Sequence, residues 1–156
     1  MAGQDQAGVR FPPPFVYLGF LLLGPLLGKL LGEPGFGLSL TQRLVAGLGL
    51  ALMGIAIGAA AVGLFRKAGT DPAPWKPSTA IVRSGLYGIT RNPMYVGMAV
   101  VYVGLALALD SVIAFLMLPI VLIVIQTQVI AREERYLETK FGDDYRRYKA
   151  SVPRWL

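Results

Sequence analysis

Two short polar groups interrupt an otherwise apolar chain, and both contain residue types that bind or move charge. The first, residues 91–93 (RNP), directly precedes a long apolar segment. Asparagine followed by proline is typical of a helix start, where free N–H groups and the positive end of the helix dipole attract anions. Arg91 stands one residue outside this start. The group therefore suits a small carboxylate or phosphate ligand, although the Asn-Pro pair alone is equally consistent with a simple helix cap.

The second group is the glutamate pair Glu133-Glu134, which follows the last apolar segment. In a regular helix Glu133 shares a stripe with Gln126, Ile130 and Leu137, whereas Glu134 lies about 100° further round. A solvated helix beside the membrane would explain the charges alone. An amide such as Gln126 is costly within a span unless it faces the bundle interior. We therefore expect Glu133 to face the interior and Glu134 to reach the 66–91 connection, pairing with Arg83 or Arg91.

Composition limits the available chemistry. The chain of 156 residues has no cysteine and no histidine, so a thiolate nucleophile, the commonest general base and the commonest metal ligands are missing. We expect no metal site. Charged residues make up only 15%, against about 25% in soluble domains. We attribute the net charge of +6 to the positive-inside rule and to anionic lipids rather than to nucleic acid.

The polar groups must be positioned by membrane helices. Four weakly charged segments, each near the length of about 20 residues that spans a bilayer, are expected to be transmembrane helices: 15–32, 44–65, 92–109 and 111–131. Gly54 and Gly58 form a GxxxG pattern, which indicates close helix packing. The last two segments meet at Asp110-Ser111 and should form a tight hairpin. Pro119 should kink the fourth helix.

Lysine and arginine indicate the orientation. They concentrate in the 66–91 connection and in the tail after residue 131, and the 110–111 turn has none. Four spans with both termini cytoplasmic satisfy this distribution, and we expect a bacterial inner-membrane protein. The connection contains three prolines and Trp75, which favour a folded lid or interfacial loop over a continuous helix. The chain is thus predicted to be a single all-α membrane domain over 1–156.

The tail should begin as a continuation of the fourth helix, to about Lys140, with Gly142 as its stop. Beyond it, Tyr145, Tyr148, Val152 and Trp155 follow at amphipathic spacing. We expect a C-terminal amphipathic helix along the cytoplasmic face. A helix lying on the membrane surface is an alternative interpretation of the same spacing.

GLYGITRNPMYVG (85–97) and EERYL…FGDDYRRYKASVPRW (133–155) together resemble the isoprenylcysteine carboxyl methyltransferase family. The likeness covers residues 79–155, about half of the chain. The wider superfamily includes phospholipid N-methyltransferases and NADPH-dependent sterol reductases. This chain departs from the pattern at Asn92, where the family more often has histidine, and at Leu86, where proline is common. Asn92 keeps a capping side chain but cannot titrate.

The resemblance implies a membrane methyltransferase that uses S-adenosylmethionine and acts on a lipophilic or lipid acceptor. Arg91 and the 92–95 helix start would hold the cofactor's carboxylate. Glu133 or Glu134 would hold its ammonium or a ribose hydroxyl, and Arg132 or Arg135 could orient an acidic acceptor. The full set of candidates comprises catalytic Glu133, Glu134 and Arg132, and cofactor-binding Tyr87, Arg91, Asn92, Pro93, Met94, Tyr95, Gln126, Glu133, Glu134 and Tyr145.

Several alternatives remain open from sequence. A carboxylate acceptor needs no base and fits the lack of histidine and cysteine slightly better, whereas an amine acceptor requires a glutamate to remove a proton. A reductase-like enzyme using NADPH would have a similar motif. A non-catalytic membrane scaffold would leave Glu133 and Glu134 beside Gln126 without a role.

Overall fold

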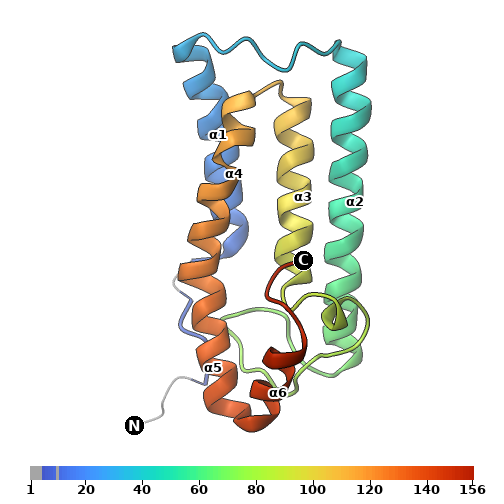
Figure 1. The fold of residues 1–156 in the computed structure, drawn as a ribbon, viewed down its shortest axis with the longest axis vertical. Coiled ribbons are helices and arrows are strands. Elements are labelled where there is room, and N and C mark those ends of the chain that lie inside the picture. The colour runs from blue at the N-terminus through green and yellow to red at the C-terminus, as the bar shows by residue number, and fades with distance from the viewer. Residues whose placement is uncertain (1–4, 10) are drawn as a thin grey trace.

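The computed structural model describes residues 5–9 and 11–156, which form helices and loops without a strand. Four helices run along the long axis of the molecule (Figure 1). Below them α5 continues the line of α4, and α6 turns back at the lower end of the molecule (Figure 1). The elements are α1 (Pro13–Leu31), α2 (Leu40–Lys67), the 3₁₀ turn η1 (Gly85–Gly88), α3 (Pro93–Ala108), α4 (Val112–Ile125), the π-helical η2 (Gln126–Ile130), α5 (Ala131–Phe141) and α6 (Asp143–Ser151).

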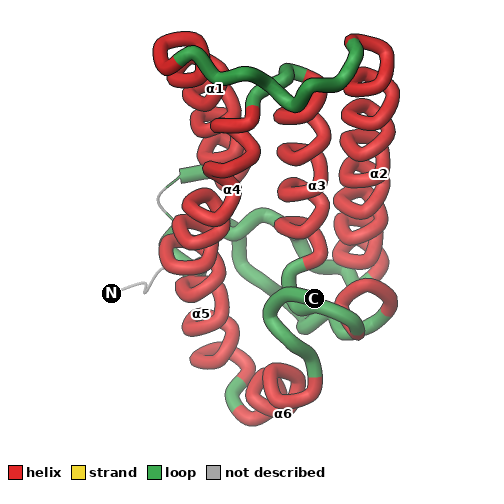
Figure 2. Tube along the Cα trace, turned by 45° about the horizontal axis from the view of Figure 1, so that its top comes forward, coloured by secondary structure: helices red, strands yellow, loops and turns green. Residues whose placement is uncertain are grey.

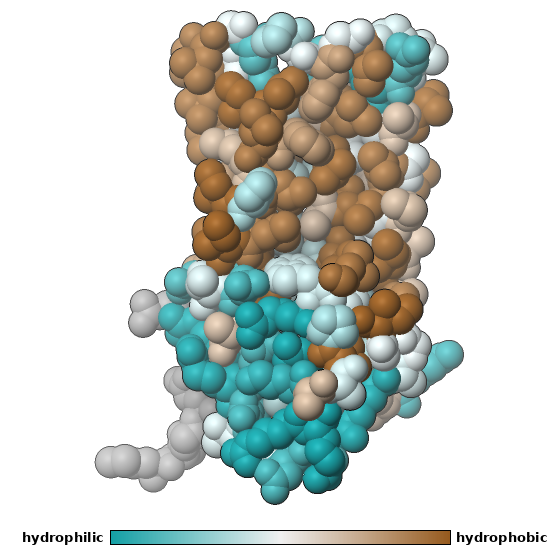
Figure 3. Space-filling model, viewed as in Figure 1, coloured by the Kyte–Doolittle hydropathy of each residue, from teal (hydrophilic) through white to brown (hydrophobic). Residues whose placement is uncertain are grey.

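The surface divides into an apolar belt over the four long helices and a polar region over α5, α6 and the 66–91 connection (Figure 3). Three helical stretches are long and apolar enough to cross a membrane: Pro13–Leu31, Leu40–Lys67 and Val112–Phe141. Helix α3 is apolar but has only 16 residues. The chain is therefore an all-helical integral membrane protein, and four complete spans remain a prediction.

The interface between α2 and α3 consists of reciprocal glycine contacts. A Cβ atom on Gly54 would lie 2.5 Å from the carbonyl oxygen of Gly97, and one on Gly47 would lie 2.5 Å from that of Gly104. The two backbones therefore approach as closely as helices can, as the GxxxG pattern predicts. Helix α1 packs on α4 in a similar way, because Gly24 lies against Ala114.

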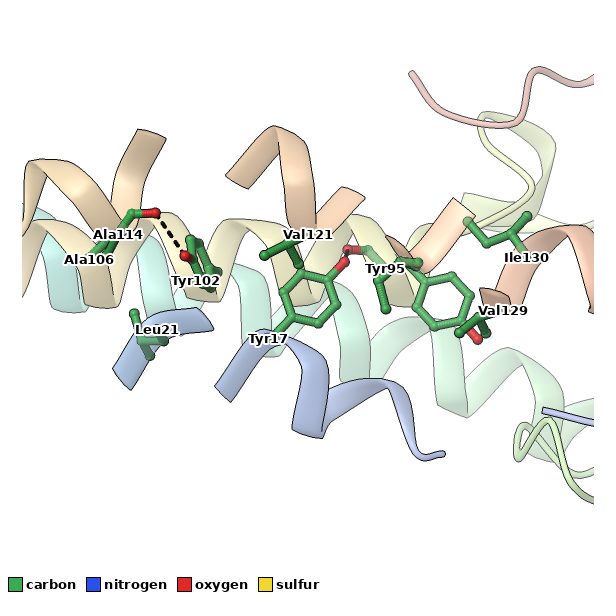
Figure 4. Packing of buried hydrophobic residues seen from close by; sticks show 10 residues of the cluster. Tyr17, Leu21, Tyr95, Tyr102, Ala106, Ala114, Val121, Val129 and Ile130 are labelled. Carbon is green, nitrogen blue, oxygen red and sulfur yellow. Dashed lines mark hydrogen bonds between the residues drawn. The ribbon is translucent and has the colours of Figure 1, made fainter. Parts of the chain in front are cut away.

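A buried cluster between α1, α3 and α4 is rich in tyrosine (Figure 4). Two of its hydroxyls have backbone partners, since Tyr102 donates to the carbonyl of Ala114 at 2.7 Å and Tyr17 donates to that of Tyr95 at 3.1 Å. These bonds satisfy polar groups that lipid could not. They also fix the start of α3, where Tyr95 lies, against α1.

The predicted hairpin between α3 and α4 is confirmed. Asp110 adopts a left-handed φ of 60°, and the Ser111 side chain caps α4 by accepting from the amide of Ala114. The Asp110 carboxylate pairs with Arg43 at 3.0 Å and accepts from the amide of Phe36. The turn is thus tied both to α2 and to the loop before it.

Helix α4 passes through Pro119 and continues into α5 through one π-helical turn (Figure 2). A π turn inserts an extra residue into the helical register, and such turns are frequent at functional sites. The regular 3.6-residue spacing assumed for residues 126–137 is therefore wrong. Helix α5 ends at Phe141, and Gly142 follows with a positive φ of 56°, which confirms the predicted stop.

Candidate functional site

A polar cavity lies where the start of α3, α5, α6 and the 66–91 connection meet. Its empty volume is about 760 Å³, its open mouth included. The 66–91 connection contributes wall residues between Asp71 and Val82, and it also contributes Tyr87 and Arg91. The charged and aromatic lining residues are Phe65, Asp71, Lys76, Tyr87, Arg91, Tyr95, Glu133, Glu134, Tyr136, Tyr145 and Tyr148.

An ion triad forms one side of the cavity. The Glu134 carboxylate lies 2.9 Å from Nη1 of Arg91 and accepts two hydrogen bonds from Arg154, at 3.0 Å from Nε and 2.6 Å from Nη2. The side chains of Glu134 and Arg91 are 7% and 9% exposed. A buried carboxylate needs such pairing to remain charged. The predicted pairing of Glu134 with Arg91 is confirmed, but Arg154 was not foreseen as a partner.

Glu133 has a different environment on the same cavity. Its Oε1 accepts a hydrogen bond of 2.8 Å from the Tyr95 hydroxyl, and no salt bridge joins it to another described residue. Burial raises the pKa of Glu133 to about 7, and the neighbouring Glu134 charge adds to the rise while the Tyr95 bond opposes it. Glu133 is thus the carboxyl group that can gain and lose a proton near neutral pH.

Three buried side-chain atoms around the cavity lack hydrogen-bond partners among the described residues: Tyr87 Oη and the Nε and Nη1 atoms of Arg91. The Nη1 atom is close to Glu134 but is not aligned for a hydrogen bond. Unpaired buried donors are costly. Donors of this kind on a cavity wall are available to an anionic or hydroxyl-bearing ligand.

The structure corrects the expected geometry of the glutamate pair. Glu134, expected to point away from the interior, is buried at 6% exposure, whereas Glu133 is partly buried. Both line the same cavity. Within α5 the two residues still lie about 100° apart, and the cavity is wide enough for both to reach it. The π-helical turn at Gln126–Ile130 instead changes the register of both glutamates relative to Gln126.

Three other candidates have side-chain partners that were not predicted. Asn92 occupies the N-cap position, but its side chain forms no cap; its Nδ2 donates instead to the carbonyl of Arg154 at 2.9 Å. Gln126 accepts from Trp155 Nε1 at 2.8 Å and does not line the cavity. Arg132 reaches the carbonyl of Gly8 and the side chain of Gln128, and it is also outside the cavity wall.

The remaining candidates lie in η1, at the start of α3 and in α6. Tyr87, Met94, Tyr95 and Tyr145 line the cavity, and Asn92 does so as well. Pro93 is buried at the first turn of α3 and is not part of the wall. The apolar face of α6 is buried against Ile81 and Leu137. That packing favours a helix held against the end of the bundle over a helix lying free on the membrane surface.

Two parts of the wall were not predicted from the sequence: Tyr136 of α5 and Ala7 of the N-terminal segment. Tyr136 accepts from the Ser78 amide and donates to Asp5, which also pairs with Lys140 at 2.7 Å. These contacts bring the connection and the N-terminal segment to α5, and Ala7 reaches the cavity. No local pattern marks them, because each joins segments far apart in the chain.

A second, apolar groove of about 1010 Å³ lies alongside the cavity within the belt. Helices α1 and α2 form its walls, and α3 contributes Gly97, Met98 and Val101. Among the lining residues Met94 is common to the groove and the polar cavity. Met94 therefore lies where the polar cavity meets the apolar groove.

Comparison with known proteins gives the geometry a family context. An uncharacterized protein of Haemophilus influenzae is 48% identical over 63 residues, which are 40% of this chain and 100% of that protein. A protein-S-isoprenylcysteine O-methyltransferase of Schizosaccharomyces pombe is 36% identical over 73 residues, 47% of this chain and 31% of the yeast protein. No solved structure matches. The profile of the phospholipid methyltransferase family matches residues 42–144. These residues include nearly all of α2, all of α3 and both glutamates. Because the match covers more than half of the chain, the chain belongs to the phospholipid methyltransferase family.

Proposed function

We propose that the protein is an integral membrane methyltransferase that binds S-adenosylmethionine in the polar cavity. The observation that carries the proposal is the set of unpaired buried donors of Arg91 and Tyr87 on a wall that also holds Glu133. The cofactor supplies an activated methyl group on a sulfonium, and its other end carries a carboxylate, an ammonium and an adenosine. A cavity with unpaired guanidinium donors, a carboxyl group outside any described salt bridge and several tyrosines matches that set of groups.

Each residue would meet the part of the cofactor that its chemistry suits. Arg91, at the positive end of the α3 dipole, would bind the carboxylate. Glu133 would hold the ammonium or a ribose hydroxyl, and the Tyr87 hydroxyl would donate to the sugar or the base. Tyr145 offers a ring for adenine packing. Because Glu134 is already neutralised by two arginines, it would support the site without contributing net charge.

The groove between α1 and α2 supports a lipophilic acceptor. An apolar chain would lie along Gly97, Met98 and Val101, while the acceptor head would enter the cavity beside Met94. Reaction requires the nucleophile, the methyl group and the sulfur to lie in line. Met94 at the junction is placed to limit how far the head advances.

An amine head group fits this cavity better than a carboxylate. Glu133 has its pKa raised to about 7 by burial, so it can take the proton that an ammonium must lose before its nitrogen attacks. The two arginines expected to orient an acidic acceptor, Arg132 and Arg135, are not on the cavity wall. Carboxylate O-methylation is the second candidate, favoured by the likeness to the yeast isoprenylcysteine methyltransferase.

The polar end of the molecule, with the cavity and the C-terminus, is proposed to face the cytosol. Its surface is strongly polar beside the apolar belt (Figure 3), and lysine and arginine concentrate there. Four spans with cytoplasmic termini, in a bacterial inner membrane, satisfy this distribution. Cytosolic cofactor would then reach the cavity directly.

Transfer of label from methyl-tritiated S-adenosylmethionine tests the proposal. The purified protein would be assayed with vesicles containing an aminophospholipid, vesicles containing a long-chain carboxylic acid, and vesicles of phosphatidylcholine alone. The aminophospholipid should become labelled well above the other two. Label only in the acid would assign O-methylation, and no label in any lipid, with no cofactor bound, would contradict the proposal.

A further inference from the structure

The C-terminal residues 152–155 (VPRW), here called the strap, run back from α6 to the start of α3. The strap crosses in front of the lower end of α3, where the C-terminus is marked (Figure 1). Two of its carbonyls accept hydrogen bonds from the segment before α3: Pro153 from the Arg91 amide at 2.9 Å, and Arg154 from the Thr90 hydroxyl at 3.1 Å. The Asn92 side chain adds a third bond, to Arg154. The strap is therefore bonded to the residues that open α3.

The C-terminal part of the strap is also held by η2 and α5. The Arg154 guanidinium grips both oxygens of Glu134, and the Trp155 indole donates to Gln126 in the π-helical turn. Trp155 also packs against the buried cluster of the bundle. The strap thus joins α3 to α5 behind the wall that carries Arg91, without lining the cavity itself.

This arrangement gives both Glu134 oxygens an arginine partner. Oε1 is shared by Arg91 and Arg154, and Oε2 is bonded to Arg154. Glu133 keeps one oxygen outside any described hydrogen bond. The two neighbouring carboxylates therefore have separate roles: Glu133 is available to a ligand, and Glu134 connects the strap to Arg91.

We propose that the strap is a positioning element for cofactor binding, and that Arg154 and Glu134 are positioning residues that hold Arg91 in place for the cofactor's carboxylate. The inference rests on the proposed function. Strap docking and cofactor binding are then coupled, because a ligand that needs the ordered Arg91 also favours the docked strap. Such coupling is reciprocal.

The experiment compares the full-length parent with Arg154→Gln. The matched control is Arg147→Gln, which removes an exposed arginine that pairs with Asp144 on the same helix. Binding of S-adenosylhomocysteine is measured by calorimetry, and kcat and the cofactor KM are measured with the labelled acceptor. Arg154→Gln should weaken binding by about tenfold or more, as expected for loss of a charge-assisted bond, mostly through KM. The control should match the parent.

Strap docking has its own readout, because the chain has two tryptophans and Trp75→Phe leaves Trp155 as the single emitter. In that background, Arg154→Gln should make Trp155 more accessible to iodide quenching, and saturating S-adenosylhomocysteine should restore protection. A role in stability alone would lower the melting temperature without ligand-dependent protection. If Arg154→Gln does not fold, Trp155→Phe in the otherwise unaltered chain supplies the affinity comparison.

The outcomes separate the inference from the function on which it rests. Parent-like affinity in Arg154→Gln, or weakened affinity with Trp155 still protected, would overturn the strap's role while the cofactor site stands. A parent that binds no S-adenosylhomocysteine would remove the proposed function, and the inference with it.

Discussion

The apolar half and the polar half of this molecule are held together in opposite ways. In the apolar half, α2 meets α3 through Gly47, Gly54, Gly97 and Gly104, with backbone against backbone. In the polar half, segments about sixty residues apart are joined by side-chain hydrogen bonds and ion pairs, such as Tyr148 to the Tyr87 carbonyl. Lipid offers no hydrogen bonds, so close packing holds the helices together in the apolar belt, whereas polar contacts hold the segments together beside water.

The largest effect should come from filling the glycine contact. Gly54→Ala places a methyl group 2.5 Å from the Gly97 oxygen, and such overpacking costs about 1–3 kcal/mol or more. Gly49→Ala, on the open side of the same helix with nothing within 4 Å, should be neutral or stabilising by up to about 1 kcal/mol, since alanine favours helix. Thermal unfolding in detergent measures both. Equal melting temperatures would show that the α2–α3 contact is looser than described.

The next largest effect concerns catalysis in the polar half. Glu133→Gln should abolish methyl transfer to an amine acceptor while the protein stays folded, because the amide keeps the shape and the Tyr95 contact but cannot take a proton. Rates with the labelled cofactor and circular dichroism of the variant measure the two parts. Full activity in Glu133→Gln would exclude this residue as the proton acceptor.

The pH profile sharpens the same assignment. Burial raises the pKa of Glu133 to about 7, so the carboxyl is protonated below that pH and ionised above it. Activity with an amine acceptor should rise with pH through about 7 and then level off. The effect on stability has the opposite sign, since burying the ionised form costs free energy: this residue should lower the free energy of unfolding as pH rises from the ordinary glutamate pKa of 4.5 to about 7. A flat activity profile across pH 6–8, the window that brackets a pKa of about 7, would contradict the role.

A smaller effect is expected at Asn92. Its side chain does not cap α3 but donates to the Arg154 carbonyl of the strap, and a single hydrogen bond is worth about 0.5–1.5 kcal/mol. Asn92→Ala should therefore weaken cofactor binding by about two- to tenfold and change the melting temperature little. Calorimetry with S-adenosylhomocysteine measures the change, and parent-like affinity would remove Asn92 from the site.

The two halves also differ in how far sequence reasoning reaches. The GxxxG pattern at Gly54 and the residues Asp110-Ser111 predicted the close packing and the tight hairpin, because both depend on local spacing. The pairing of Glu134 with Arg91 was predicted as one of two possibilities, since opposite charges beside a membrane seek each other.

The errors have physical reasons in the same structure. The π-helical turn at Gln126–Ile130 shifts the register, so a stripe drawn with regular spacing placed Glu134 outside and Gln126 in the site. The Asn92 side chain donates to the carbonyl of Arg154, 62 positions along the chain. Capping rules consider only neighbouring residues, so they could not predict this partner. Spacing within a regular helix can be predicted from the sequence, whereas partners that a chain reversal brings from a distant segment cannot.

Equilibrium binding of radiolabelled S-adenosylmethionine to the purified protein tests the central claim most directly, with NADPH in parallel. The account predicts saturable binding of one cofactor per chain, at least about tenfold weaker in Arg91→Gln, where a charge-assisted contact is lost. Arg83→Gln, an exposed arginine paired with Asp144, should bind as the parent does, and NADPH should not bind. Saturable NADPH binding without S-adenosylmethionine binding, or equal cofactor affinity in Arg91→Gln, would contradict the account.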